Sequence, residues 1–196
     1  MVPLLCGCIS RPPLNVRTFA FTAPPAAKPD PGFRSHRVIA IRPLRVAAPF
    51  DGRSFVYRTG EYSFESDPYA EFFASTSESL LLPIRGSLRQ AGAFEAVVEP
   101  GSALKPNTVA EISVVELYGD FRRPHEAAGV LRLRVLLFDC PNGVPAKLIL
   151  EQEYSRRIPL KARSADALMA GWNKALAEIL TQFDSDVRCL KPAPDA

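Results

Sequence analysis

The chain has 196 residues and is 47% hydrophobic, which is enough to bury one ordinary core. Its formal net charge is only +3, with Lys and Arg scattered along the chain, so the charge does not favour a nucleic-acid-binding surface. After residue 9 no run approaches the roughly 18 apolar residues of a membrane-spanning helix. We therefore expect any membrane contact to be made through an anchor.

The N-terminal residues Leu5-Cys6-Gly7-Cys8 have the pattern of a bacterial lipobox. A signal peptidase accepts only small side chains just before its cut, and the thiol of Cys8 would then carry the lipid. Acyl chains such as palmitate contribute about 0.8 kcal/mol per buried methylene, so a multiply acylated cysteine anchors firmly. We predict lipid attachment at Cys8 and a domain that faces the periplasm.

Residues 1–8 are shorter than a complete secretory signal. Seven residues precede Cys8 and none is Lys or Arg, whereas a signal needs a basic region and roughly 7–15 apolar residues. We therefore expect residues 1–8 to be the end of a truncated signal that starts further upstream. In the alternative interpretation Cys8 is never acylated, and the chain is a soluble envelope assembly factor.

Residues 9–36 are rich in proline and predict an extended tether. An apolar interruption at 16–22 is a candidate short strand that would attach the far end of the tether to a sheet. About 14 extended residues, at roughly 3.1 Å each, would reach on the order of 40 Å.

The next stretch predicts short strands followed by a helical block. The strands, expected as a meander, cover residues 38–46, 54–58 and 62–64. Asp67-Pro68 then predicts a turn or a first helical segment that continues to Phe73. Ser77 is the expected N-cap of a helix ending near Gly92, and Pro83 is expected to break or kink that helix.

Longer strands and one strong helix make up the rest of the chain. Strands are predicted at 94–98, 111–118, 129–139 and 147–154, the last continuing towards residue 160. Ser164 is a good N-cap for a helix with a continuous apolar stripe to Phe183. We predict an α+β fold: a mostly antiparallel sheet with two main helices packed on it, forming a single compact domain. The domain covers residues 37–187, followed by a tail at 188–196.

Five side chains in the last third of the chain carry alternative interpretations. Trp172, Leu176 and Phe183 lie on the apolar stripe and are expected to pack on the sheet. The alternatives are that they face a partner subunit, or that they line an apolar cavity that carries lipid. Cys140 and Cys189 would pair in an oxidising compartment, or remain two separate thiols.

The motifs of common enzymes are missing from the sequence. Its two histidines, His36 and His125, have no metal-ligand spacing, and no phosphate-binding loop or nucleophile elbow occurs. We expect no enzyme activity, no catalytic residue, no cofactor and no metal. The basic runs at 122–123, 156–157 and 161–163 would form a patch for anionic lipid or an acidic protein if strand ends converge. Otherwise they are a solvated sheet edge.

Several segments, together with the lipobox, resemble the ABC-type transport auxiliary lipoproteins, a group that includes the paraquat-inducible protein C-like lipoproteins. The resemblance covers roughly residues 37–187. The segments that carry it are Val97-Val98-Glu99-Pro100-Gly101-Ser102, Glu116-Leu117-Tyr118-Gly119-Asp120-Phe121, Leu131 to Leu137, Ser164 to Leu168, and Trp172 to Leu176.

This resemblance implies a supporting role in transport. Members of the family are outer-membrane lipoproteins that work with an MCE-domain protein, a permease and an ATPase to move phospholipid or other hydrophobic molecules between membranes. For this chain it implies a lipid-anchored auxiliary component held by outer-membrane lipid, without a nucleic-acid partner. Ile9 after Cys8 is consistent with outer-membrane sorting. A homo-oligomer around a channel partner is expected by analogy.

Overall fold

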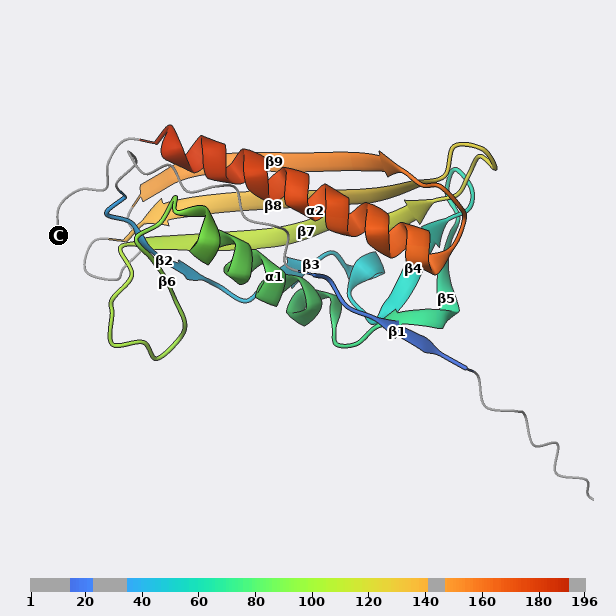
Figure 1. The fold of residues 1–196 in the computed structure, drawn as a ribbon, viewed down its shortest axis with the longest axis horizontal. Helices are drawn as coiled ribbons and strands as arrows, with labels where there is room; N and C mark the ends of the chain where they lie inside the picture. Colours follow the sequence, from blue (N-terminus) through green and yellow to red (C-terminus); the bar gives the residue numbers. More distant parts are fainter. Residues whose placement is uncertain (1–14, 23–34, 141–146, 191–196) are drawn as a thin grey trace, which may run out of the picture.

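The computed structural model describes residues 15–22, 35–140 and 147–190. Cys8 and the lipobox lie outside the described residues. Within the described part, nine strands form one sheet and two α-helices pack on it (Figure 1). The elements are β1 (Arg17–Phe19), β2 (Val38–Ile41), β3 (Arg45–Val46), the 3-10 helix η1 (Ala48–Phe50), β4 (Ser54–Arg58), β5 (Phe64–Phe72), α1 (Thr76–Ala91), β6 (Ala96–Val98), β7 (Thr108–Asp120), β8 (Ala128–Asp139), β9 (Lys147–Pro159) and α2 (Ala165–Arg188).

Strand β7 is the centre of the sheet, because strands pair along both of its edges. On one edge β8 runs antiparallel to β7, and β9 runs antiparallel to β8. On the other edge β2, β3 and β4 follow one another, each parallel to β7. The predicted meander is therefore wrong for these three strands, although β4 and β5 do form an antiparallel hairpin. The thirteen residues of β7 are long enough to take all three short partners.

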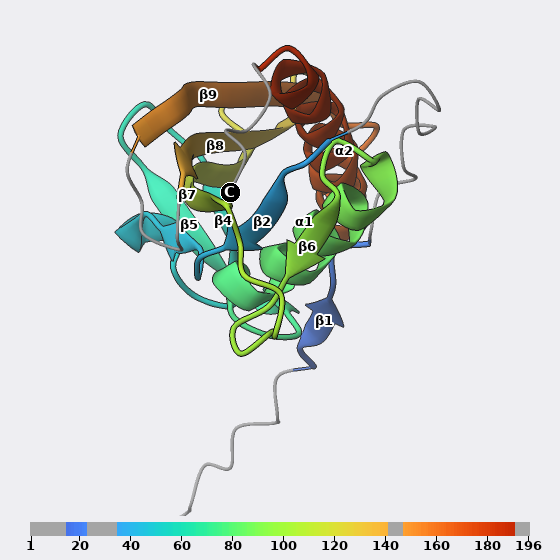
Figure 2. The ribbon, with the colours of Figure 1, turned by 90° about the vertical axis from the view of Figure 1, so that its left-hand side faces the viewer.

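Both helices cover the same face of the curved sheet, and the core lies between the two layers (Figure 2). On β8 the alternating residues Leu131, Leu133, Val135 and Leu137 are all buried on this face. The fold is α+β, with two helices on a sheet whose two longest pairings are antiparallel, as the sequence predicts. Burial of this apolar surface is the main contribution to stability.

The segment that begins at Asp67 is strand rather than the turn or helical segment that we predicted. β5 continues through Asp67 and Pro68 to Phe72. The Asp67 carboxylate accepts hydrogen bonds from the backbone N–H groups of Tyr69 and Ala70, at 2.7 and 3.2 Å. The register of the β4–β5 pairing shifts here, and such an irregularity tolerates a proline that has no N–H to donate. The Asp-Pro signal therefore marks an irregularity within a strand.

Helix α1 has a different N-cap from the predicted one and continues through a proline. The side chain of Ser75, not Ser77, accepts a hydrogen bond from the backbone N–H of Glu78, and the Glu78 carboxylate accepts one in return. Pro83 is buried inside the helix and does not end it. Gly92, with φ of 77°, ends the helix in the left-handed conformation that glycine adopts without steric cost.

Strand β1 attaches the N-terminal segment to the sheet. It runs parallel to β5, and Arg17 makes a two-point ion pair with Asp166 in the first turn of α2. Phe21, just after the strand, is buried in the core. This attachment leaves only residues 9–16 between Cys8 and the sheet, fewer than the 14 extended residues considered for the tether.

Candidate functional site

The candidate site lies at the end of the sheet where β7 finishes. Asp120 is the last residue of β7, and Arg58, the last residue of β4, lies opposite it in the parallel ladder. β9 also finishes at this end, where Pro159 lies opposite the first residue of β8. Three strand ends and two connections, residues 121–127 and 160–163, therefore meet at one end of the molecule (Figure 1).

The carboxylate of Asp120 is 2% exposed and binds two guanidinium groups. Arg122 donates from Nε to Oδ1 at 2.9 Å and from Nη2 to Oδ2 at 2.7 Å. Arg157, from β9, donates from Nη1 to Oδ2 at 2.5 Å. These bonds, first those from Arg122 and then those from Arg157, hold the pKa of Asp120 well below its ordinary value despite its burial. Asp120 is therefore ionised across the neutral range.

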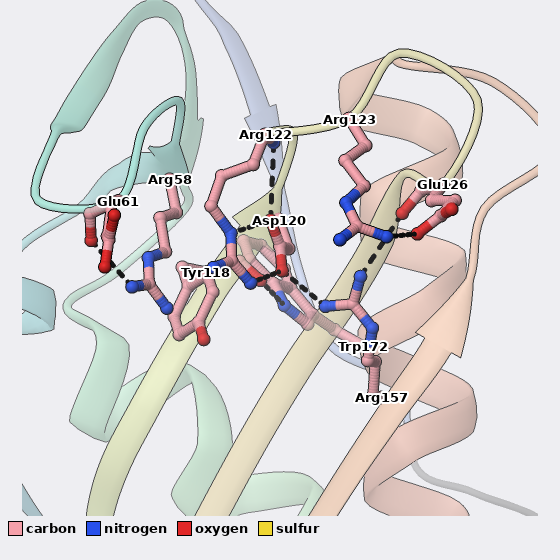
Figure 3. A network of polar contacts seen from close by, with 9 residues as sticks. All are labelled: Arg58, Glu61, Tyr118, Asp120, Arg122, Arg123, Glu126, Arg157 and Trp172. Carbon is pink, nitrogen blue, oxygen red and sulfur yellow. Dashed lines mark hydrogen bonds and ion pairs between the residues drawn. The ribbon is translucent and has the colours of Figure 1, made fainter.

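A second ion pair and a surface pocket adjoin this carboxylate. Arg123 donates to the Glu126 carboxylate at 2.9 Å, and Arg157 donates to the Glu126 backbone carbonyl at 3.3 Å. We call Asp120, Arg122, Arg123, Glu126 and Arg157 the Asp120 cluster. These five residues line a pocket of about 340 Å³ (Figure 3). Three guanidinium groups against two carboxylates leave its lining with excess positive charge.

Aromatic side chains flank the Asp120 cluster. The Phe121 ring stacks on Tyr57, with centroids 4.8 Å apart, and the Arg163 guanidinium lies 4.9 Å from the centre of the same ring. The β4–β5 hairpin, to which Tyr57 belongs, also carries Tyr62, which is 88% exposed, and Phe64, which is 45% exposed. Basic and aromatic groups are thus adjacent at this end.

The chemistry of the Asp120 cluster suits the binding of anions. A guanidinium has five N–H donors, and Asp120 takes only part of those on Arg122 and Arg157. Planar guanidinium groups match phosphate and carboxylate oxygens well. By contrast, a carboxylate with a lowered pKa is a poor group for proton transfer near neutral pH. The arrangement therefore suits recognition of negative charge.

The residues predicted as a partner or cavity surface lie in the core. Trp172 and Leu176 are fully buried, and Phe183 is 2% exposed. The Trp172 ring packs against Phe55 and Phe72, with centroids 4.8 and 5.7 Å apart. These side chains therefore pack on the sheet and present no surface to a partner subunit.

The two described cysteines are free thiols, Cys140 buried and Cys189 exposed. They do not form the disulfide that the sequence allowed. Within residues 15–22, 35–140 and 147–190, no group of three or more His, Cys, Asp or Glu side chains could hold a metal ion. Among the described helices, none is long and apolar enough to cross a membrane.

The strand ends bring together only part of the predicted basic patch. Arg157 joins the Asp120 cluster, but Arg156 points to the other face of β9, because successive strand residues alternate. There it pairs with Glu178 and Gln182 of α2, at 3.2 and 2.7 Å. Asp120 was not predicted as a site residue. Its one signal in the sequence is an aspartate two residues before a pair of arginines.

Comparison with known proteins shows the fold. The sequence matches no protein-family model and no curated protein. Among solved structures, the chain is similar to protein XCC0632 from Xanthomonas campestris, of family DUF330, with a TM-score of 0.72, 14% identity, and coverage of 85% of this chain and 92% of that one. It is also similar to an uncharacterised protein with a TM-score of 0.65, 13% identity, and coverage of 87% and 99%. At these identities the likeness is one of fold.

Proposed function

We propose that the chain is a non-enzymatic, lipid-anchored auxiliary domain of the bacterial envelope. In this proposal it serves an ABC/MCE-type system that moves phospholipid or other hydrophobic cargo between membranes. Its anchor is Cys8, held in the outer membrane with the domain facing the periplasm. Its partners are an MCE-domain protein and, through it, permease and ATPase subunits. The sequence resemblance and the fold shared with a DUF330 protein support this proposal.

The observation that carries the proposal is the attachment of β1 so close to Cys8. Arg17 is paired to β5 and to Asp166 of α2, and only residues 9–16 separate it from Cys8. An acylated Cys8 would therefore hold the folded domain beside a bilayer. A domain fixed in this way suits an adaptor that positions other components at a membrane.

The packing of the core favours an adaptor over a lipid carrier with its own cavity. The side chains that would line such a cavity, Trp172, Leu176 and Phe183, are buried against other core residues. Trp172 also donates hydrogen bonds to the backbone carbonyls of Val130 and Tyr118, at 3.1 and 3.4 Å, which fix the indole on the sheet. Opening a lipid cavity here would break these contacts.

The anchor is tested by the intact mass of the protein expressed from its native upstream region in a Gram-negative host. We expect the membrane fraction to contain a chain that begins at Cys8 and carries acyl mass. The Cys8→Ala variant should fold with an unchanged thermal melt and move to the soluble fraction. An unacylated chain that retains Met1, or membrane retention of Cys8→Ala, would contradict the anchor and favour a soluble assembly factor.

The partner is tested by photo-crosslinking in the native host. A crosslinking amino acid is placed at the exposed positions Leu82 and Leu104, which lie in different parts of the domain. We expect at least one position to form an adduct with a tagged MCE-domain protein, and the adduct to disappear when that protein is deleted. The absence of an adduct from a set of positions that covers the exposed surface would overturn the MCE assignment.

A further inference from the structure

The excess positive charge of the chain is gathered in two neighbouring segments. Residues 120–127 and 157–163 together contain five basic and two acidic side chains, a net charge of +3. The whole chain also carries +3, so its remainder is formally neutral. Hydrogen bonds join the segments, from Arg157 to Asp120 and from Arg163 to the Phe121 carbonyl at 3.1 Å. Basic residues that are scattered in the sequence therefore make one end of the fold positive.

The adjacent β4–β5 hairpin adds exposed aromatic groups to this end. Arg58 lies opposite Asp120 in the β4–β7 ladder, and its guanidinium is 5.7 Å from the centre of the Phe64 ring. Tyr62 is at the tip of the hairpin and is 88% exposed. Between residues 54 and 72 the hairpin carries one arginine, three glutamates and one aspartate, so its contribution to this surface is aromatic and not basic. Figure 3 shows Arg58 on the hairpin side of Arg122.

The start of β1 places the anchored segment near the same end. Arg17 pairs with Asp166, which comes three residues after Arg163. The chain from Cys8 to Arg17 spans about 32 Å at most when fully extended. The opposite end of α2, at Arg188, is 22 residues or about 33 Å beyond Asp166. A lipid on Cys8 is therefore tethered to the domain near its positive end and far from the C-terminal end of α2.

We propose that this end of the molecule is a membrane-contacting surface that binds the phosphate groups of an anionic bilayer, the same bilayer in which the anchor is held. The orientation rests on the proposed lipidation of Cys8, whereas the charge and the aromatic groups do not. Arginine and lysine bind anionic headgroups, and exposed tyrosine favours the membrane interface. An anchor reinforced by a basic patch is more stable than the anchor alone.

The surface is tested with the full chain carrying Cys8→Ala, so that no acyl chain contributes. We expect this protein to float with vesicles of phosphatidylglycerol and phosphatidylethanolamine, and not with phosphatidylcholine vesicles. Raising the salt concentration should weaken the binding, because the contact is electrostatic. Failure to bind anionic vesicles at low salt would overturn this inference and leave the intact-mass test of the anchor unaffected.

Two matched double variants locate the surface. Arg123→Gln/Lys161→Gln removes two exposed charges that do not contact Asp120. It should lower vesicle affinity about tenfold to thirtyfold, since each basic residue near an anionic surface contributes about a factor of five. Lys105→Gln/Lys147→Gln makes the same change in net charge at the opposite end of β7 and β9, where we expect less than a threefold effect. Equal losses in the two variants would contradict a localised surface.

A fluorescent probe reports the orientation directly. Tyr62→Trp places an indole at the hairpin tip, and Leu104→Trp places one near the start of β7 at the opposite end. Bromine-labelled anionic vesicles should quench the first and leave the second unchanged. The native Trp172 is buried and is a constant background in both variants. Stronger quenching of the Leu104 variant would overturn the proposed orientation.

Discussion

At the scale of single residues, Asp120 is the group whose charge matters most. Its buried carboxylate accepts bonds from Arg122 and Arg157, so Asp120→Asn leaves both guanidinium groups without their charged partner. We expect the free energy of unfolding at pH 7 to fall by about 1.5–3 kcal/mol, the usual range for hydrogen bonds to charged groups. Urea unfolding followed by circular dichroism measures the loss.

The pH dependence of the free energy of unfolding follows from the direction in which folding shifts the pKa of Asp120. The pKa of Asp120 is lowered on folding, chiefly by Arg122, so its ionisation stabilises the folded state above the unfolded pKa of about 3.9. This contribution is lost as the pH falls towards the folded pKa, so the difference between wild type and Asp120→Asn should shrink below about pH 4. Glu126→Gln, in an exposed pair, should cost less than about 1 kcal/mol at pH 7. A difference that grows in acid would contradict this explanation.

The candidate site was only partly predictable from the sequence. The basic pairs are visible in the sequence. The predicted patch required strand ends to converge, and the ends of β7 and β9 do so. The partner of Arg157 is 37 residues away, however, and depends on the register of both β7–β8 and β8–β9. A shift of one residue would exchange Arg157 for Arg156 at this face. Local pattern therefore identified the charges, and sheet register decides which of them meet.

At the scale of elements, the spacing between α2 and the sheet depends on glycine. A Cβ at Gly119 would lie 2.9 Å from both Leu168 Cδ2 and Tyr57 Cδ1. The Tyr57 ring has little freedom to move, because it stacks on Phe121 and its hydroxyl donates to Asp67 at 2.6 Å. We expect Gly119→Ala to destabilise the fold by about 1–3 kcal/mol, the usual cost of overpacking, as measured by urea unfolding.

Gly171→Ala is the matched control on the helix side. Its Cβ would lie 2.6 Å from Leu160 Cδ2, the far end of a half-buried, flexible side chain that can change rotamer. Replacing a glycine within a helix also gains roughly 0.5–1 kcal/mol. The two effects oppose each other, so the net change should lie within about 1 kcal/mol of zero. A larger loss of unfolding free energy in Gly171→Ala than in Gly119→Ala would show that Gly119 does not set the spacing between α2 and the sheet.

Phe21, just after β1, adds a buried core contact to those that Arg17 and Phe19 of the strand make. Phe21 stacks on Phe72 and Trp172, with centroids 5.5 and 6.5 Å apart. In Phe21→Ala we expect β1 to detach while the larger sheet remains folded, because β1 pairs with β5 alone among the described strands. Trypsin should then cleave after Arg17 at least tenfold faster than in wild type. Val16→Ala, at a partly exposed position, should leave the cleavage rate unchanged.

The success of the sequence predictions differed between elements for physical reasons. Helix α2 and strands β8 and β9 were predicted well, because long periodic patterns outweigh local exceptions. Errors occurred at prolines. Pro68 is accommodated at an irregularity of β5, and Pro83 is carried within α1, where packing compensates for a missing hydrogen bond. The parallel pairing of β2, β3 and β4 with β7 joins residues too distant for any local pattern to predict.

At the scale of the whole molecule, β7 joins all the parts of the fold. It pairs with β8 along its length and takes β2, β3 and β4 in turn, while both helices lie on the same side of the sheet (Figure 2). Asp120, at the positive end, is the last residue of β7. Strand β7 therefore connects this end to the rest of the sheet, to which β1 is attached. Orientation at a membrane would therefore be transmitted to the whole domain as a rigid unit.

This connectivity predicts a single cooperative unfolding transition. The chain has one tryptophan, Trp172, which is fully buried and bonded to carbonyls of β7 and β8, so its fluorescence reports contact between α2 and the sheet. Far-ultraviolet circular dichroism reports the secondary structure as a whole. Because α2 has no separate core of its own, the urea midpoints from the two probes should coincide within error. An earlier fluorescence transition would show that α2 leaves the sheet before the strands separate, and would exclude a rigid adaptor.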